Sequence, residues 1–182
     1  MNFIEDLKWR GALNQVTDEA GLLEAMADGK IGAYVGTDPT ADSLHLGHLI
    51  PFMVLKRFQN AGGKAVIIVG GATGAIGDPR PTTERQLLTP EQLAENEKGI
   101  TAQVTKLFGD DDTRIVNNND WLGKLTLTDF LRDYGKLFSI NVMLKKDVVA
   151  SRLETGISFT EFTYQVLQGI DFHELWRRED VK

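Results

Sequence analysis

The chain has 182 residues, of which 42% are apolar and 25% charged, values typical of one globular domain with a buried core. It contains no cysteine, which excludes disulfides, thiol catalysis and thiolate zinc sites, and three histidines leave little room for a histidine-rich metal centre. The net charge of −6 argues against binding nucleic acid through bulk charge but leaves a local site open. No apolar run is long enough to cross a membrane and the first residues lack an apolar signal core, so we expect a cytoplasmic protein.

Helical and strand patterns alternate along the chain. In order, they predict helices over residues 5–10 and 17–27, a strand at 31–35, a helix over 45–61, a strand at 65–69, a glycine-rich loop at 70–81, a helix opening at Thr89, a strand at 114–117, helices over 126–138 and 147–154, and a helix from Ser158 to Trp176. Thr17 is an N-cap candidate, and Thr89 and Ser158 open capping boxes. Strands alternating with helices predict an α/β fold, a parallel sheet covered on both faces.

The most informative stretch joins the first predicted strand to the next helix, from Tyr34 to His48. Turn formers end the strand, and helical spacing begins at His45. A helix N-terminus presents unpaired N–H groups and the positive end of a dipole, which suits phosphate. His45 and His48 share a face and can donate to phosphate oxygens, while Gly47 leaves room for a flat ligand against the backbone. The plainer interpretation of such a pair is a capped amphipathic helix with two ordinary histidines.

Two further polar groups accompany this stretch. The glycine-rich loop carries Thr73 and Asp78, and its glycines permit close approach of a ligand or simply a tight turn. Tyr164, Gln168 and Asp171 are spaced four and three apart, so they share one helix face. Such a stripe is usually the wet side of a helix, but its apolar neighbours indicate that part of it is buried and needs partners. Both loops follow strands, so both should lie at the carboxyl edge of the sheet, where parallel sheets bind ligands.

The run His45-Leu46-Gly47-His48 resembles the HIGH motif of the class I aminoacyl-tRNA synthetases. The longer string from Tyr34 to His48 resembles the bacterial tyrosyl-tRNA synthetases, and the resemblance spans nearly the whole chain. It implies a Rossmann-like catalytic core and a ligase that activates L-tyrosine with ATP and Mg²⁺ and transfers it to tRNA(Tyr). It also implies a homodimer, with no tightly bound cofactor and no protein metal site.

The resemblance further implies roles for individual residues. The catalytic set would be Thr40, His45, His48 and Arg85, with Thr40 and His45 at the pyrophosphate and Arg85 near the leaving phosphates. The ATP contacts would be Gly36, Asp38, Thr40, His45, Gly47 and His48. The tyrosine contacts would be Tyr34, Thr73, Asp78, Asn118, Tyr164, Gln168 and Asp171. Within the last set, Tyr34 and Asp171 would hold the phenol, Asp78, Tyr164 and Gln168 the ammonium, and Asn118 would support Asp171.

The sequence also departs from the family pattern. A second glycine-rich nucleotide segment, a mobile lysine loop and anticodon-binding domains do not occur before Lys182, and the loop at 80–85 lacks the lysines often found there. We therefore expect residues 1–182 to be the N-terminal portion of a Rossmann-like catalytic domain, nearly inactive alone. Two alternatives stay open: a non-catalytic tyrosine-binding fragment, and a small H-x-G-H nucleotidyltransferase that does not act on tRNA.

Overall fold

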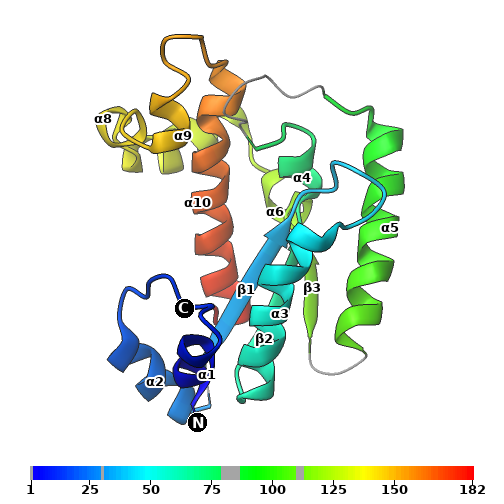
Figure 1. Cartoon of the computed structure of the whole chain (residues 1–182). Helices are drawn as coiled ribbons and strands as arrows, with labels where there is room; N and C mark the ends of the chain where they lie inside the picture. Colours follow the sequence, from blue (N-terminus) through cyan, green and yellow to red (C-terminus); the bar gives the residue numbers. More distant parts are fainter. Residues whose placement is uncertain (1, 30, 79–86, 110–112) are drawn as a thin grey trace.

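A three-stranded parallel sheet forms the centre of the chain (Figure 1). The computed structural model describes residues 2–29, 31–78, 87–109 and 113–182. The strands are β1 (Gly32–Thr37), β2 (Lys64–Val69) and β3 (Arg114–Asn117), in the order β1-β2-β3. Ala33 pairs with Ala65 and Val66 with Arg114, both in parallel register. All three predicted strands are confirmed, and so is the α/β class.

Helices occupy most of the remaining described residues. Their bounds are α1 Phe3–Trp9, α2 Glu19–Ala27, α3 Leu46–Asn60, α4 Gly71–Gly74, α5 Pro90–Phe108, α6 Asn119–Leu122, α7 Leu127–Asp129, α8 Ile140–Met143, α9 Asp147–Ala150 and α10 Phe159–Glu179. A π-helical turn, η1 (Phe130–Tyr134), and a 3-10 turn, η2 (Gly135–Leu137), follow α7. None of the helices in the described ranges has both the length and the hydropathy to span a membrane.

The two faces of the sheet are covered by different helices. β2 is buried on both sides because its side chains alternate between two apolar clusters. Ile67 packs with α3 and α5, where Phe52 and Phe108 are almost fully buried. Val66 packs on the other face with α10, through side chains such as Ile170. In Figure 1, α10 accordingly stands on one side of the strands, and α3 and α5 on the other. This layering places the start of α3 and the middle of α10 near the carboxyl end of β1.

Three helix starts differ in detail from the sequence prediction. The cap of α2 is Asp18, which accepts from Gly21 N, and not Thr17. His45 is the N-cap of α3 and not its first helical residue. Thr89 forms the full capping box expected for α5. At α10, Ser158 accepts from the backbone of Glu161, but the Glu161 side chain pairs with a distant arginine and so does not complete a box.

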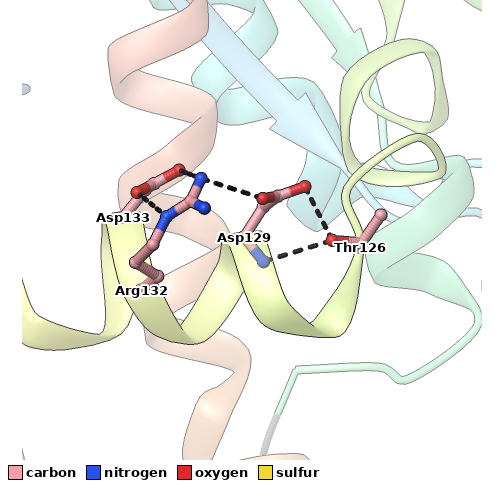
Figure 2. Close-up of polar contacts among 4 residues, drawn as sticks. All are labelled: Thr126, Asp129, Arg132 and Asp133. Atoms are coloured by element: carbon pink, nitrogen blue, oxygen red, sulfur yellow. Dashed lines mark hydrogen bonds and ion pairs between the residues drawn. The ribbon is translucent and has the colours of Figure 1, made fainter.

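The segment after β3 is more irregular than its helical pattern predicts. The predicted helix over 126–138 is a single α turn followed by the π and 3-10 turns, and the predicted helix over 147–154 ends at Ala150. Figure 2 shows the polar contacts of the first of these segments: Thr126 caps α7 through Asp129, and Arg132 bonds both Asp129 and Asp133. Of these bonds, the one from Asp129 N to Thr126 Oγ1 satisfies a backbone group at the start of α7, and the others join surface side chains.

Candidate active site

A cavity of about 610 Å³ opens at the carboxyl end of β1, between the start of α3, the α4 turn and α10. We call it the main cavity. Its lining brings together most of the residues predicted from the sequence, namely Tyr34, Gly36, Asp38, Thr40, His48, Thr73, Asp78, Tyr164, Gln168 and Asp171. These come from four separate stretches of the chain, which meet because parallel strands and the helices that follow them share one edge.

The polar stripe of α10 faces this cavity. Tyr164, Gln168 and Asp171 all line it, so their four-and-three spacing does place them on one working face of the helix. Asp171 is buried, with 6% of its surface exposed. A carboxylate this buried is not part of a solvated helix surface, which was the alternative interpretation. It needs hydrogen-bond donors from the protein.

Two donors hold the Asp171 carboxylate. Asn118 Nδ2 donates to Asp171 Oδ2 over 3.0 Å, and Trp121 Nε1 donates to Oδ1 over 2.7 Å. Asn118 is itself fully buried, and its amide oxygen accepts from Ala72 N at 2.9 Å. The expected support of Asp171 by Asn118 is therefore present. The sequence analysis did not predict the support by Trp121, because a tryptophan three positions after Asn118 indicates only a core residue.

Asp171 and Tyr34, the two groups at the end of this pocket, differ in protonation state at neutral pH although the pKa of each is raised. Burial raises the pKa of Asp171 to about 6, against the lowering effect of the bonds from Asn118 and Trp121, while Asp38 adds to the rise. Burial, together with the nearby Asp171 charge, raises the pKa of Tyr34 to about 12. At neutral pH the pocket therefore presents an acceptor carboxylate beside a protonated phenol. The Tyr34 ring is held edge-on to Phe172, with centroids 5.3 Å apart.

Asp38 is the second acid of the main cavity, and its partners differ from the expected ATP contact. Its carboxylate accepts from Tyr164 Oη at 2.8 Å and from Thr73 Oγ1 at 2.6 Å. Thr73 Oγ1 in turn accepts from Asn118 at 2.9 Å, so the two acids are linked through one chain of hydrogen bonds. Gly70 lies so close to Asp38 that any side chain there would collide with the carboxylate. The glycine at that position therefore serves packing and not ligand approach.

The histidine pair forms a stacked unit at the start of α3. His45 Nδ1 accepts from Gly47 N at 3.0 Å, and His48 Nδ1 accepts from His45 N at 3.2 Å. Their rings stack with centroids 3.9 Å apart. Since each Nδ1 is an acceptor, each neutral ring carries its proton on Nε2, which leaves that N–H as the donor for a ligand. Burial and the proximity of His45 lower the pKa of His48, which favours this neutral form.

Gly47 does not leave a bare surface as the sequence suggested. A Cβ at this position would lie 2.8 Å from His45 Cε1, because the His45 ring folds back over the glycine. His48 lines the main cavity, whereas His45 lines a neighbouring apolar groove with Leu46 and Leu49. Gly47 therefore makes room for the His45 ring in this structure.

The match to known proteins is consistent with this geometry. A family model described as tRNA synthetases class I (W and Y) matches residues 26–178. This chain belongs to that family. A tyrosine–tRNA ligase of Leuconostoc citreum is 95% identical over all 182 residues, and one of Pediococcus pentosaceus is 62% identical over the whole chain. In both cases the chain spans 44% of the relative's length.

Solved structures of the synthetase family share the fold. A C-terminally truncated mitochondrial tyrosyl-tRNA synthetase of Coccidioides posadasii superimposes with a TM-score of 0.84 at 33% identity, over the whole of this chain and 53% of that one. A tyrosyl-tRNA synthetase of Archaeoglobus fulgidus, solved with L-tyrosine, has a TM-score of 0.67 at 18% identity and covers 84% of this chain and 46% of that one. At that identity the likeness shows the fold alone.

Three of the predicted site residues of this synthetase chain do not line the main cavity. His45 and Gly47 lie beside it, and Asn118 lies behind its wall under Asp171. Arg85 lies outside the described residues. Within the described ranges, no group of three or more histidine or acidic side chains could hold a metal ion.

Proposed function

We propose that this chain is part of a tyrosine–tRNA ligase, which activates L-tyrosine with MgATP to tyrosyl-adenylate and transfers the tyrosyl group to tRNA(Tyr) in the longer protein. The observation that carries the proposal is the buried Asp171 carboxylate, held by two donors beside the protonated phenol of Tyr34. The curated names of relatives as similar as 95% support it. Residues 1–182 would then be the N-terminal portion of a Rossmann-like catalytic domain.

The phenol of tyrosine is proposed to bind between Tyr34 and Asp171. Each Asp171 oxygen accepts one bond from the protein and retains capacity for a second, so the substrate hydroxyl can donate there and accept from Tyr34. Phenylalanine would leave both buried groups unpaired, and that penalty is the physical basis of its rejection. Tyrosyl-tRNA synthetases are the standard example of this discrimination.

The ammonium of tyrosine is proposed to bind at the other end of the stripe, near Asp78, Tyr164 and Gln168, with Thr73 close by. All four line the main cavity. Burial, with the nearby Asp38 charge next in importance, raises the pKa of Tyr164, which keeps its phenol protonated as a donor to Asp38. The carboxylates of Asp38 and Asp78 on this side of the cavity favour a cationic group. Tyrosine would thus be recognised at both ends by residues of one face of α10, together with Tyr34 and Asp78.

The chemical step needs no general base. The ionised carboxylate of tyrosine attacks the α-phosphorus of ATP, one P–O bond forms as the bond to pyrophosphate breaks, and a ribose hydroxyl of tRNA later displaces AMP. Catalysis therefore consists of positioning and of donors aimed at developing phosphate charge. The Nε2–H groups of His45 and His48 are proposed as such donors, with Thr40, Arg85 and the backbone at Gly36 and Gly47 completing the nucleotide site. Mg²⁺ would enter with the ATP phosphates as part of the substrate.

We propose that the longer protein is a homodimer in the cytoplasm, as the family resemblance implies. Support comes from the segment that follows α6, where large apolar side chains face solvent. Leu127 is 73% exposed, Leu137 71% and Ile140 62%. Large apolar side chains exposed in one short segment are a feature of surfaces that contact another protein.

The proposal is tested on the longer protein by tyrosine-dependent ATP–pyrophosphate exchange with wild type and Asp171→Ala. We expect exchange with tyrosine and not with phenylalanine in the wild type. The Asp171→Ala variant should bind tyrosine more weakly and lose much of its preference over phenylalanine. Asp120→Ala, an exposed acid on α6, is the matched control and should leave the preference unchanged. An intact preference in Asp171→Ala would remove the assignment.

A further inference from the structure

A second cavity of about 560 Å³ lies beside the main one, and we call it the side cavity. It lies along α10 and is lined on its other side by the segment from η2 to α9. Its walls are largely apolar and include Phe138, Val142, Met143 and Val149. The volume falls in the usual range for small-molecule sites, roughly 300–1,000 Å³. The side cavity shares Asp78, Tyr164, Gln168 and Phe172 with the main cavity, so the two adjoin along one helix face.

Several polar side chains interrupt this lining, among them Ser139, Lys146 and Gln165, and Glu161 is its buried carboxylate. Glu161 is 2% exposed, and its Oε2 accepts from Arg152 Nη2 over 3.1 Å. Its other oxygen, Oε1, receives no hydrogen bond from any residue in the described part of the chain. Native proteins almost always satisfy buried polar atoms, and an unpaired oxygen of a charged group is among the most costly to leave. Glu161 therefore offers an acceptor at the wall of the side cavity.

The surroundings define which donor would fit. Arg152 already balances the charge of Glu161, so a second cation is not required, and a neutral N–H or O–H suffices. The neighbouring walls of leucine, valine, methionine and phenylalanine favour a flat apolar body. We propose that the side cavity binds a small neutral aromatic molecule whose single ring N–H or O–H donates to Glu161.

Such a ligand would be coupled to the main cavity. It would touch Tyr164, Gln168 and Phe172, which also line the main cavity. A ligand that alters these side chains changes the affinity of the other site, and the effect is reciprocal. This coupling, unlike the binding itself, rests on the proposed tyrosine function.

The test uses the full-length protein saturated with L-tyrosine, which occupies the main cavity, and indole as the probe. Indole carries one N–H donor, and 1-methylindole is its matched partner without a donor. Binding is followed by the NMR shift of the Met143 methyl group, assigned with Met143→Leu, because Met143 is buried in the wall of the side cavity. We expect indole to shift this signal saturably and 1-methylindole to bind about tenfold more weakly, the usual effect of losing one such hydrogen bond.

A variant separates recognition by Glu161 from simple apolar partition. Glu161→Gln can keep an oxygen toward Arg152 while placing an amide N–H where Oε1 was, so indole should bind about tenfold more weakly. Glu154→Gln, an exposed acid before the same helix, should not change its affinity. Equal binding of indole and 1-methylindole, or an unmoved Met143 signal, would overturn the proposal. If Glu161→Gln does not fold, the comparison of indole with 1-methylindole on the wild type still tests binding in the side cavity. Pyrophosphate exchange tests the proposed function separately.

Discussion

Replacing Trp121 by phenylalanine removes the indole N–H that holds Asp171 and keeps most of the buried ring. A hydrogen bond to a charged group is worth about 1.5–3 kcal/mol, and one pKa unit corresponds to about 1.4 kcal/mol. The bond favours the ionised carboxylate and so lowers the pKa of Asp171 within an environment that raises it to about 6. Its loss should therefore raise that pKa by roughly one to two units further.

The direction of the pH effect follows from the form that binds. The ionised Asp171 is the proposed acceptor for the phenol, so tyrosine binding should weaken as pH falls through the pKa of this group. In wild type the fall occurs near pH 6. In Trp121→Phe it should begin roughly one to two pH units higher, so affinity near neutral pH is lost while affinity near pH 9 is largely retained.

The assay is calorimetric titration of tyrosine across pH 5.5–9 on the longer protein. Trp176→Phe is the matched control, because Trp176 lies on the same helix as Asp171 but is 57% exposed, and it should leave the pH profile unchanged. An unshifted profile in Trp121→Phe would show that the indole bond does not set the state of Asp171. A uniform loss at all pH values would show that the indole acts only through packing.

Three further predictions concern the histidine pair and the buried ion pair. His45→Ala should lower the rate of pyrophosphate exchange by roughly 10²–10³ with little change in tyrosine affinity, and equal damage to both would contradict a contact with the transferring phosphates. Gly47→Ala should also slow exchange, because its Cβ displaces the His45 ring, and the double variant should be no slower than His45→Ala alone; additive losses would separate the two residues. Arg152→Met should lower the free energy of unfolding by about 3–5 kcal/mol in urea melts because it leaves Glu161 buried and unpaired, whereas Arg132→Met on the surface should cost at most about 1 kcal/mol.

The parts of the fold that the sequence predicted correctly are those governed by local pattern. The run at 65–69 is apolar at every position, because both faces of β2 are covered, and it could be nothing but a buried strand or helix segment. The spacing of Tyr164, Gln168 and Asp171 needs only helical geometry to place them together. The capping box at Thr89 is likewise local, since both of its bonds lie within three residues.

The parts that sequence reasoning missed depend on contacts between distant segments. Glu161 matched a capping box, but a buried arginine nine positions earlier takes its carboxylate instead. Trp121 and Asp171 are joined by a hydrogen bond across fifty positions that no local pattern announces. The helix predicted over 126–138 keeps α-helical geometry only over α7 and then widens into the π turn η1, a departure that its apolar spacing does not indicate.

The main cavity has a consequence for the timing of synthesis. One of its walls, at Tyr34, belongs to the first strand, and the opposite acid, Asp171, belongs to the last helix. A ribosome that adds 5–20 residues per second needs roughly 7–27 seconds to pass from one to the other. Once β2 has been synthesised it can pair with β1, but until α10 follows, Tyr34 lacks Asp171 and the face of the sheet that α10 covers stays bare. The nascent chain therefore carries exposed apolar strand surface from the synthesis of β2 until α10 leaves the exit tunnel, and the main cavity cannot form before then.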